Sequence, residues 1–278
     1  GALITAGMIL LVYTLTEASK WGWLSIHTIG FFALSAALVA GFFWNESRVE
    51  RPLVPLSVFK IGNIAAADLT QLPITASVFA MFFFVSLYVQ SVLGFSPVAS
   101  GLAFLPVPLV IAITAMLAPR LIRRVGYKPI LVIAPWLLAG GLLILAHVPV
   151  EGSYYTHVLP GLVIMALGMG FSFVAITIAA TSGVPGHFSG LASGLLNTAQ
   201  QIGGALGLAI LSSVAASKTA AFLLEHPGAQ LPALVDGFQS AFSVAVLFCA
   251  IASLTALVLI KPGGRGDLAA TPPAIHGQ

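Results

Sequence analysis

The chain has 278 residues, of which 59% are hydrophobic and 7% are charged, and its formal net charge is +3. Soluble domains carry about 25% charged residues, so this composition excludes a soluble globular protein and makes lipid the solvent for most of the chain. So few charges give no indication of nucleic-acid binding, and the single cysteine, Cys249, excludes a disulfide framework within the chain.

Eight apolar segments approach or exceed the length that a transmembrane helix needs, which is roughly 20 residues. Their length, and the absence of short alternating segments, favours helices over strands. The sequence therefore predicts an all-α integral membrane protein with eight transmembrane helices. The expected spans are residues 2–18, 25–44, 65–93, 97–118, 129–148, 157–181, 190–216 and 238–260.

The Lys and Arg residues lie mainly on one side of this predicted bundle. Nine of the 11 follow the second, fourth and last spans. They are Arg48, Arg51, Lys60, Arg120, Arg123, Arg124, Lys128, Lys261 and Arg265. By the positive-inside rule this side is cytoplasmic, so we expect a multi-pass protein of the plasma (inner cell) membrane with both ends of the chain in the cytoplasm.

Three regions are expected along the chain. Residues 1–62 hold the first two spans and most of a loop, residues 48–63, whose apolar residues and prolines predict an amphipathic segment along the membrane surface. Residues 63–262 hold the other six spans, with an outward loop expected at residues 225–237. Residues 263–278 are polar and contain Pro and Gly, which predicts a disordered tail.

Four stretches carry a resemblance to a known family. They are ERPLVPLSVF (50–59), QSVLGFSPVASGLAFLP (90–106), RLIRRVGYKP (120–129) and GLASGLLNTAQQIGGALGLAIL (190–211). In this order and spacing they resemble the 14-helix drug:proton antiporters of the major facilitator superfamily, and the resemblance covers nearly the whole chain.

The resemblance implies that the chain is two central helices followed by the C-terminal six-helix half of a major facilitator fold. The N-terminal six-helix half would then be missing, which fits an apolar run that starts at Gly1. The implied function is proton-coupled export of hydrophobic or cationic small molecules by alternating access. The implied partners are that substrate, protons, the lipid bilayer and the missing half, without which the chain should not transport.

Asp68 is an acid placed inside a predicted span, about one turn from its cytoplasmic end. Acids in membranes are costly and usually functional, which makes proton or cation handling one interpretation of Asp68. Its position near the cytoplasmic end favours the other interpretation, an interfacial role at the helix dipole. Gln71 shares its face at a spacing of three residues, and Gln90 ends the same span. These three residues are candidates for the substrate and proton pathway.

The span at 190–216 contains three amides, Asn197, Gln200 and Gln201, within an apolar run. An unpaired amide in hydrocarbon costs on the order of several kcal/mol, so we expect these side chains to line the pathway. Pairs of glycines four residues apart, at 190 and 194 and at 203 and 207, predict a helix face that allows close packing. The alternative is that the amides only bond across helices.

Met81, Phe82 and Phe83 lie in the middle of the span at 65–93. They are candidates for an adaptable cavity wall that would suit apolar substrates, although ordinary lipid or helix contact is the favoured interpretation.

The cytoplasmic motif consists of Arg120, Arg123, Arg124, Gly126 and Lys128. We expect its cations to bind anionic headgroups and fix the topology, with gating as the alternative. Arg123 stands where the family usually has an acid, so a relay through that acid is not carried over.

No enzyme is predicted. The spans lack a Ser–His pair, paired aspartates or a metal-binding cluster, so no metal and no cofactor are expected. Gly168-Met-Gly170 is too short for a nucleotide-binding loop and predicts a bend or a close helix contact. Two other functions stay open: transport of a different small solute by the same fold, and a membrane assembly subunit that does not transport.

Overall fold

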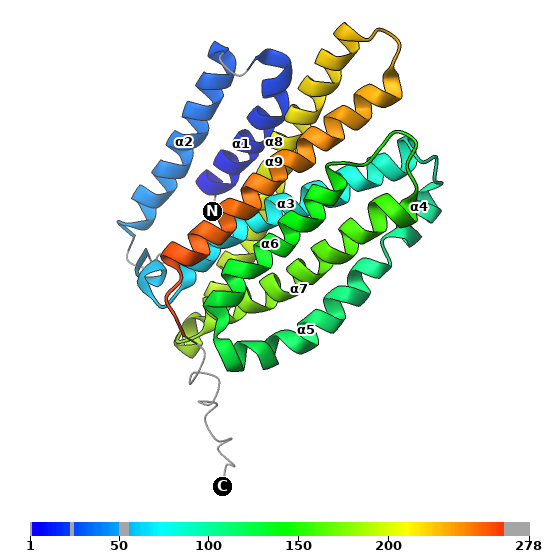
Figure 1. Cartoon of the computed structure of the whole chain (residues 1–278). Helices are drawn as coiled ribbons and strands as arrows, with labels where there is room; N and C mark the ends of the chain where they lie inside the picture. The colour runs from blue at the N-terminus through cyan, green and yellow to red at the C-terminus, as the bar shows by residue number, and fades with distance from the viewer. Residues whose placement is uncertain (1, 23–24, 50–55, 264–278) are drawn as a thin grey trace.

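The computed structural model describes residues 2–22, 25–49 and 56–263, and within these ranges the chain is helical with no strand. The elements are α1 (Ala2–Trp21), α2 (Ile26–Glu46), η1 (Leu56–Lys60), α3 (Ile64–Ser91), α4 (Pro97–Ala103), α5 (Pro106–Val125), α6 (Tyr127–Leu145), η2 (Tyr154–Val158), α7 (Leu159–Thr181), α8 (Gly186–Glu225) and α9 (Gln230–Leu259). Figure 1 shows them as a bundle of elongated helices.

The eight predicted spans all correspond to helices, and the expected all-α membrane fold is confirmed. Seven of the described helical stretches are long and apolar enough to cross a membrane, while the apolar stretch of α1 is Ala2–Thr14. The span predicted at 97–118 is divided into α4 and α5, with Pro106 as the first residue of α5. Proline has no N–H to donate and suits the first turn of a helix, which explains this division.

The expected length of the outward loop at 225–237 is wrong, while its outward position stays a prediction. Helix α8 continues to Glu225 and α9 already begins at Gln230, so the connection is only four residues long. The turn is made at Gly228, whose φ of +93° is a conformation that residues with a Cβ rarely adopt. The chain on either side of the turn stays helical beyond the apolar runs. The prediction failed because hydropathy locates the apolar part of a helix and does not set where the helix ends.

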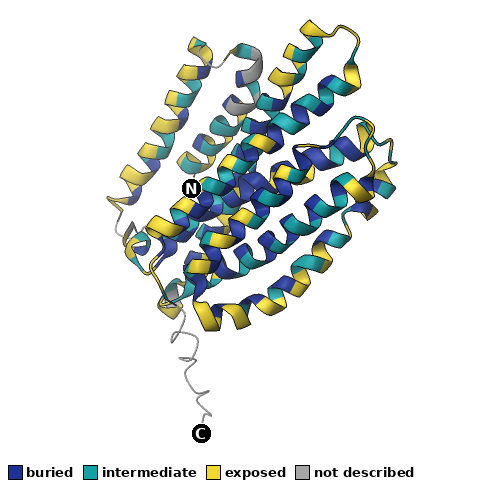
Figure 2. Ribbon diagram, in the orientation of Figure 1, coloured by how far each residue is buried: buried dark blue, intermediate teal, exposed yellow. Residues whose placement is uncertain are grey.

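Helix α3 lies at the centre of the bundle, where it packs against α7, α8 and α9. Helix α6 packs between α7 and α9, and α5 packs mainly on α7. The α1–α2 hairpin packs on the rest of the bundle through α1 and α8, and it lies at one side of the molecule (Figure 1). Buried residues accordingly concentrate in α3, α6 and α7, whereas α2 is largely exposed (Figure 2).

Glycines make the close contacts among these helices, as the small-residue rule for membrane bundles requires. A Cβ at Gly168 would lie 2.7 Å from the backbone nitrogen of Leu138 on α6. A Cβ at Gly170 would overlap Thr114 on α5. The two glycines of this short motif therefore bring α7 close to two neighbours, in agreement with the expected helix contact.

One end of the bundle holds the last turn of α5, the start of α6 and the end of α9, and we call it the basic end because Arg120, Arg123, Arg124, Lys128 and Lys261 lie there. Residues 50–55 of the expected surface loop and 264–278 of the expected disordered tail lie outside the described residues. The division near residue 62 stays a prediction.

Candidate functional site

Asp68 and Gln71 lie one turn apart on α3, near the basic end. Asp68 is half-buried, and Gln71 is 1% exposed. Asp68 Oδ1 and Gln71 Oε1 are both buried, and neither accepts a hydrogen bond from any described residue. Two buried oxygens without a donor leave a free-energy cost on the order of a few kcal/mol that a proton, a water or a cationic ligand would relieve.

The backbone around these two residues is held within α3 itself. Thr70 Oγ1 donates to the carbonyl of Ala66 at 2.7 Å, and Thr75 Oγ1 donates to the carbonyl of Gln71 at 2.9 Å. The helix continues through Pro73 without a break. The hydroxyls therefore satisfy backbone carbonyls and leave the side-chain oxygens of Asp68 and Gln71 without donors.

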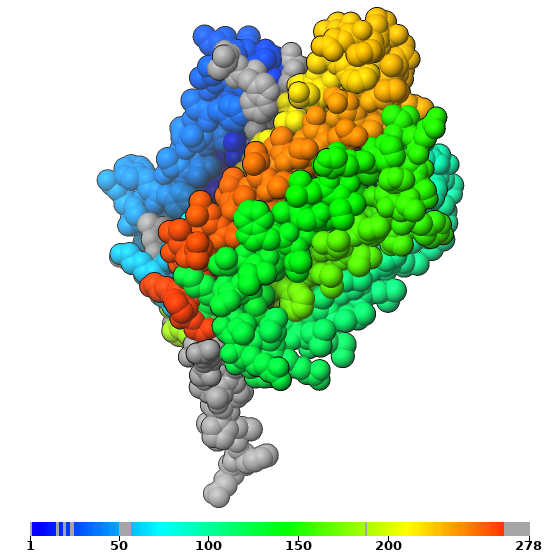
Figure 3. All heavy atoms as spheres, viewed as in Figure 1, coloured from blue at the N-terminus to red at the C-terminus, as the bar shows by residue number. Residues whose placement is uncertain are grey.

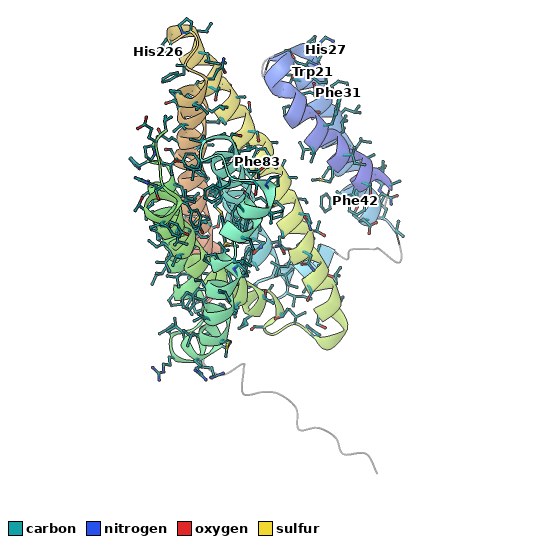
Figure 4. The ribbon with its side chains drawn as sticks, turned by 90° about the vertical axis from the view of Figure 1, so that its right-hand side faces the viewer. Trp21, His27, Phe31, Phe42, Phe83 and His226 are labelled. Carbon is teal, nitrogen blue, oxygen red and sulfur yellow. The ribbon has the colours of Figure 1, made fainter. Side chains whose placement is uncertain are left out.

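An aromatic face lies further along α3. Phe79, Phe82 and Phe83 are 38%, 36% and 41% exposed, and their spacing of three and four residues places them on one side of the helix. The Phe82 ring lies 5.4 Å from that of Phe104, centroid to centroid. Phe83 lies between the basic end and the end marked by His226 (Figure 4). These three rings form an apolar surface that is open on this chain.

Met81 differs from its two neighbours in sequence. It is fully buried in the main hydrophobic core, with 0% of its surface exposed. A side chain in that position contributes to packing within the bundle. Of the three residues considered for a cavity wall, only Phe82 and Phe83 are therefore exposed. Phe79 belongs to the same face and was not singled out from the sequence, although its spacing of three from Phe82 is visible there.

Gln90 lies at the other end of α3 and is exposed. Its Nε2 donates to Ser86 Oγ at 2.9 Å and to Ser100 Oγ on α4 at 3.3 Å. The amide therefore joins the end of α3 to α4, about six helical turns from Asp68. Gln90 therefore does not belong to the same polar site as Asp68 and Gln71, although all three residues were predicted for one pathway.

The glycine pairs of α8 have different surroundings. A Cβ at Gly203 would overlap the backbone of Leu72, and a Cβ at Gly207 would overlap Ala76, both on α3. Gly190 and Gly194 have no neighbouring atom within 4 Å of such a Cβ. Only the second pair brings α8 close to α3, whereas the first pair lies on an open face.

The three amides of α8 do not converge on Asp68 or Gln71 through any hydrogen bond in the described part of the chain. Asn197 and Gln201 are exposed and Gln200 is half-buried. Gln201 borders a groove of about 470 Å³ between α8 and α1, which is otherwise apolar. The amides of α8 and the acid of α3 are therefore distinct polar features.

The cytoplasmic motif forms the turn from α5 to α6. Arg120, Arg123 and Arg124 are exposed at the end of α5, and Lys128 is half-buried in the first turn of α6. Gly126 has a φ of +86°, and its N–H donates to the carbonyl of Ile122 at 2.8 Å. The glycine is needed for this turn, and the arginines are free to meet a charged surface.

Ser172 on α7 was not found from the sequence. It is fully buried, and its Oγ has no hydrogen-bond partner among the described residues. Serines commonly bond to a carbonyl one turn back in a helix, as Thr114 Oγ1 does with Val110 at 2.9 Å, so a lone serine carries no signal in the sequence. Within the described residues no cluster of His, Cys, Asp or Glu is placed to hold a metal ion.

Comparison with known proteins agrees with this architecture. The family model described as Major Facilitator Superfamily matches residues 1–208. The puromycin resistance protein pur8 of Streptomyces alboniger is 34% identical over 260 residues, which is 91% of this chain and 50% of that protein.

Two further relatives are similar over much of the chain. The tetracenomycin C resistance and export protein of Streptomyces glaucescens is 33% identical over 216 residues, 78% of this chain and 40% of that protein. The lincomycin resistance protein of Streptomyces lincolnensis is 30% identical over 266 residues, 95% of this chain and 53% of that protein. The chain spans about half the length of the curated relatives it matches.

Proposed function

The chain belongs to the major facilitator superfamily, and we propose that it supplies the two central helices and the C-terminal six-helix half of a proton-coupled drug exporter. The names of its relatives as resistance or export proteins support the drug part of this proposal. Coverage of about half of each relative supports the division into halves, with α1 and α2 as the central pair.

In this proposal the protein spans the plasma membrane with its basic end in the cytoplasm. The charges of Arg120, Arg123, Arg124, Lys128 and Lys261 support the orientation through the positive-inside rule. The exposed faces of α3, α5 and α8 meet a second six-helix bundle, and the substrate path runs between the two halves.

The observation that carries the proposal is the pair of buried oxygens on α3, Asp68 Oδ1 and Gln71 Oε1, that lack a donor. A protonated Asp68 carries an O–H group that can donate to a neighbouring oxygen, and the charged form cannot. The carboxyl group therefore binds a proton more tightly when it is enclosed than when water reaches it. A proton affinity that differs between two states lets a proton gradient drive alternating access.

Apolar substrates are held at the aromatic face. Phe82 and Phe83 offer large surfaces with no fixed polar demand, and a ring face also attracts an organic cation. The combination suits compounds of varied shape that are hydrophobic and often positively charged. The half-buried amide Gln200 and its exposed neighbour Gln201 line the polar side of the path in this proposal.

The test is Asp68→Asn in the full-length protein reconstituted in vesicles, with proton release on addition of drug as the readout. Asparagine keeps the size of the side chain but does not ionise, so it cannot bind and release a proton as aspartate does. Drug-induced proton release should therefore be lost. Asp236→Asn, a half-buried aspartate near the start of α9, is the matched control and should behave as the unmodified protein. Full proton release by the Asp68 variant would refute the proposed role of this acid.

A further inference from the structure

A groove of about 590 Å³ lies at the basic end, between the start of α6 and the end of α9. It is separate from the aromatic face and from Asp68. Its lining includes Val125, Lys128, Pro129, Ile133, Leu257 and Pro262. Ile133 and Leu257 are 62% and 54% exposed, so the groove is open toward the surroundings of the bundle. Figure 3 shows α9 and α6 side by side on this face.

One wall of the groove is held in place by Asn63, which is 5% exposed. The backbone N–H of Lys261 donates to Asn63 Oδ1 at 2.7 Å, and Asn63 Nδ2 donates to the carbonyl of Lys261 at 3.3 Å. Asn63 Nδ2 also donates to the hydroxyl of Tyr127 at 2.9 Å. These bonds tie the segment after α9 to the starts of α3 and α6, and we call them the Asn63 clasp.

The clasp leaves little space behind the wall. A Cβ at Gly263 would overlap the hydroxyl of Tyr127, and a Cβ at Gly126 would lie 3.0 Å from the carbonyl oxygen of Gly263. The segment that contains Pro262 therefore lies directly on the turn between α5 and α6. The groove is a preformed feature of the fold.

A second set of hydrogen bonds joins α6 to α9 next to the groove. Trp136 Nε1 donates to Ser253 Oγ at 3.0 Å, and Ser253 Oγ donates to the carbonyl of Val132 at 2.8 Å. Trp136 and Ser253 lie about one turn further from the basic end than Ile133 and Leu257, and Val132 itself lines the groove. These bonds hold α6 against α9 beside the apolar lining of the groove.

The outer rim of the groove is positively charged. Lys128 lines it, and the exposed Lys261 directly precedes Pro262. Among the described residues that line the groove none is acidic. With the orientation proposed above, this open apolar slot faces lipid and its two lysines lie near the membrane surface, which matches a molecule with an anionic head and an acyl chain.

We propose that this groove binds one anionic phospholipid. The phosphate group lies against Lys128 and Lys261, and an acyl chain lies along Ile133 and Leu257. The bound lipid fills the seam between α6 and α9 and supports the wall that the Asn63 clasp holds. A free phosphate ion would gain nothing from the apolar lining, and the groove therefore favours the lipid.

The test is native mass spectrometry of the full-length protein in detergent, titrated with phosphatidylglycerol. One phosphatidylglycerol should bind more tightly than phosphatidylcholine, and excess inorganic phosphate should not displace it. Near a membrane surface each lysine contributes about fivefold to the binding of an anionic lipid, so Lys128→Gln with Lys261→Gln should weaken binding roughly 25-fold. Ile133→Trp, at an exposed position, should also weaken binding because the indole occupies the slot while the charge is unchanged.

Lys218→Gln is the matched control, because this exposed lysine lies on α8 away from the groove. It should leave the affinity for phosphatidylglycerol unchanged. Equal loss in the control would show attraction to net charge alone and would overturn the proposal. Unchanged binding in the double lysine variant or in Ile133→Trp, or displacement by inorganic phosphate, would overturn it as well.

Discussion

The contact between α8 and α3 gives the sharpest test of the packing. Gly207 faces Ala76 so closely that an added Cβ would overlap the Cα and the Cβ of that residue. Neither atom can move without moving the backbone of α3. The substitution Gly207→Ala should therefore force the two helices apart.

The expected magnitude follows from two opposing effects. Overpacking of one methyl group into a close contact costs about 1–3 kcal/mol. Replacing glycine by alanine inside a helix gains about 1 kcal/mol. Gly194→Ala on the same helix experiences the gain alone, because nothing lies within 4 Å of its added Cβ. The difference between Gly207→Ala and Gly194→Ala should therefore be about 1–3 kcal/mol in the free energy of unfolding.

The assay is thermal unfolding of the purified protein in one detergent, with the two variants measured side by side. For a domain of this size 1 kcal/mol corresponds to about 2–4 °C in Tm, so Gly207→Ala should unfold at least about 2 °C below Gly194→Ala. Equal midpoints for the two variants would show that α8 does not approach α3 through Gly207, and the packing described above would be refuted.

Two further predictions concern the clasp and the polar face of α8. Asn63→Ala removes three hydrogen bonds of a buried amide and should lower the free energy of unfolding by about 1–3 kcal/mol, which a denaturant or thermal melt will detect; an unchanged midpoint would contradict the clasp. In a protein with Cys249→Ala, cysteines introduced at Asn197 and Gln201 should react with a water-soluble thiol reagent in at least one transport state, whereas one at the buried Met81 should stay unreactive. If both α8 cysteines fail to react with the reagent in every state, these positions do not line a water-filled path and their role is limited to packing.

The positions of the helices could be predicted from the sequence because a bilayer demands long apolar segments with every backbone group bonded internally. That demand locates the centre of each helix and says little about its ends. The region from 225 to 237 shows the difference, since α8 and α9 extend past the apolar runs to a short turn at Gly228. A helix that leaves the membrane ends where a turn residue stops it.

The surroundings of individual side chains could be predicted less well. The pair Gly190 and Gly194 and the pair Gly203 and Gly207 have the same spacing, yet only the second pair meets a neighbour. Spacing shows which residues share a face and cannot show which face another helix covers. The same limit applies to Met81, whose neighbours Phe82 and Phe83 are exposed while it is buried. On a helix that is apolar all round, the sequence alone does not indicate the covered side.

The distance along α3 between the acid and the aromatic face constrains how coupling can work. Asp68 and Phe82 are 14 residues apart on an unbroken helix, close to four turns, so they share a face but are separated by about 20 Å. A compound held on the aromatic rings therefore does not touch the carboxylate of Asp68, and the proton and the drug do not compete for one group. In the proposed exporter, coupling therefore acts through the equilibrium between two states, which each ligand shifts by its own difference in affinity.

This geometry separates two measurements on the same variant. If coupling acts through the equilibrium between states, Asp68→Asn should abolish drug-induced proton release while equilibrium binding of a hydrophobic drug persists, because the aromatic face is intact. Phe82→Ala with Phe83→Ala should do the opposite and weaken drug binding, while the proton affinity of Asp68 is unchanged. Loss of drug binding in the Asp68 variant to the same degree as loss of proton release would mean that the drug reaches the acid, and the aromatic rings would then not be its main contact.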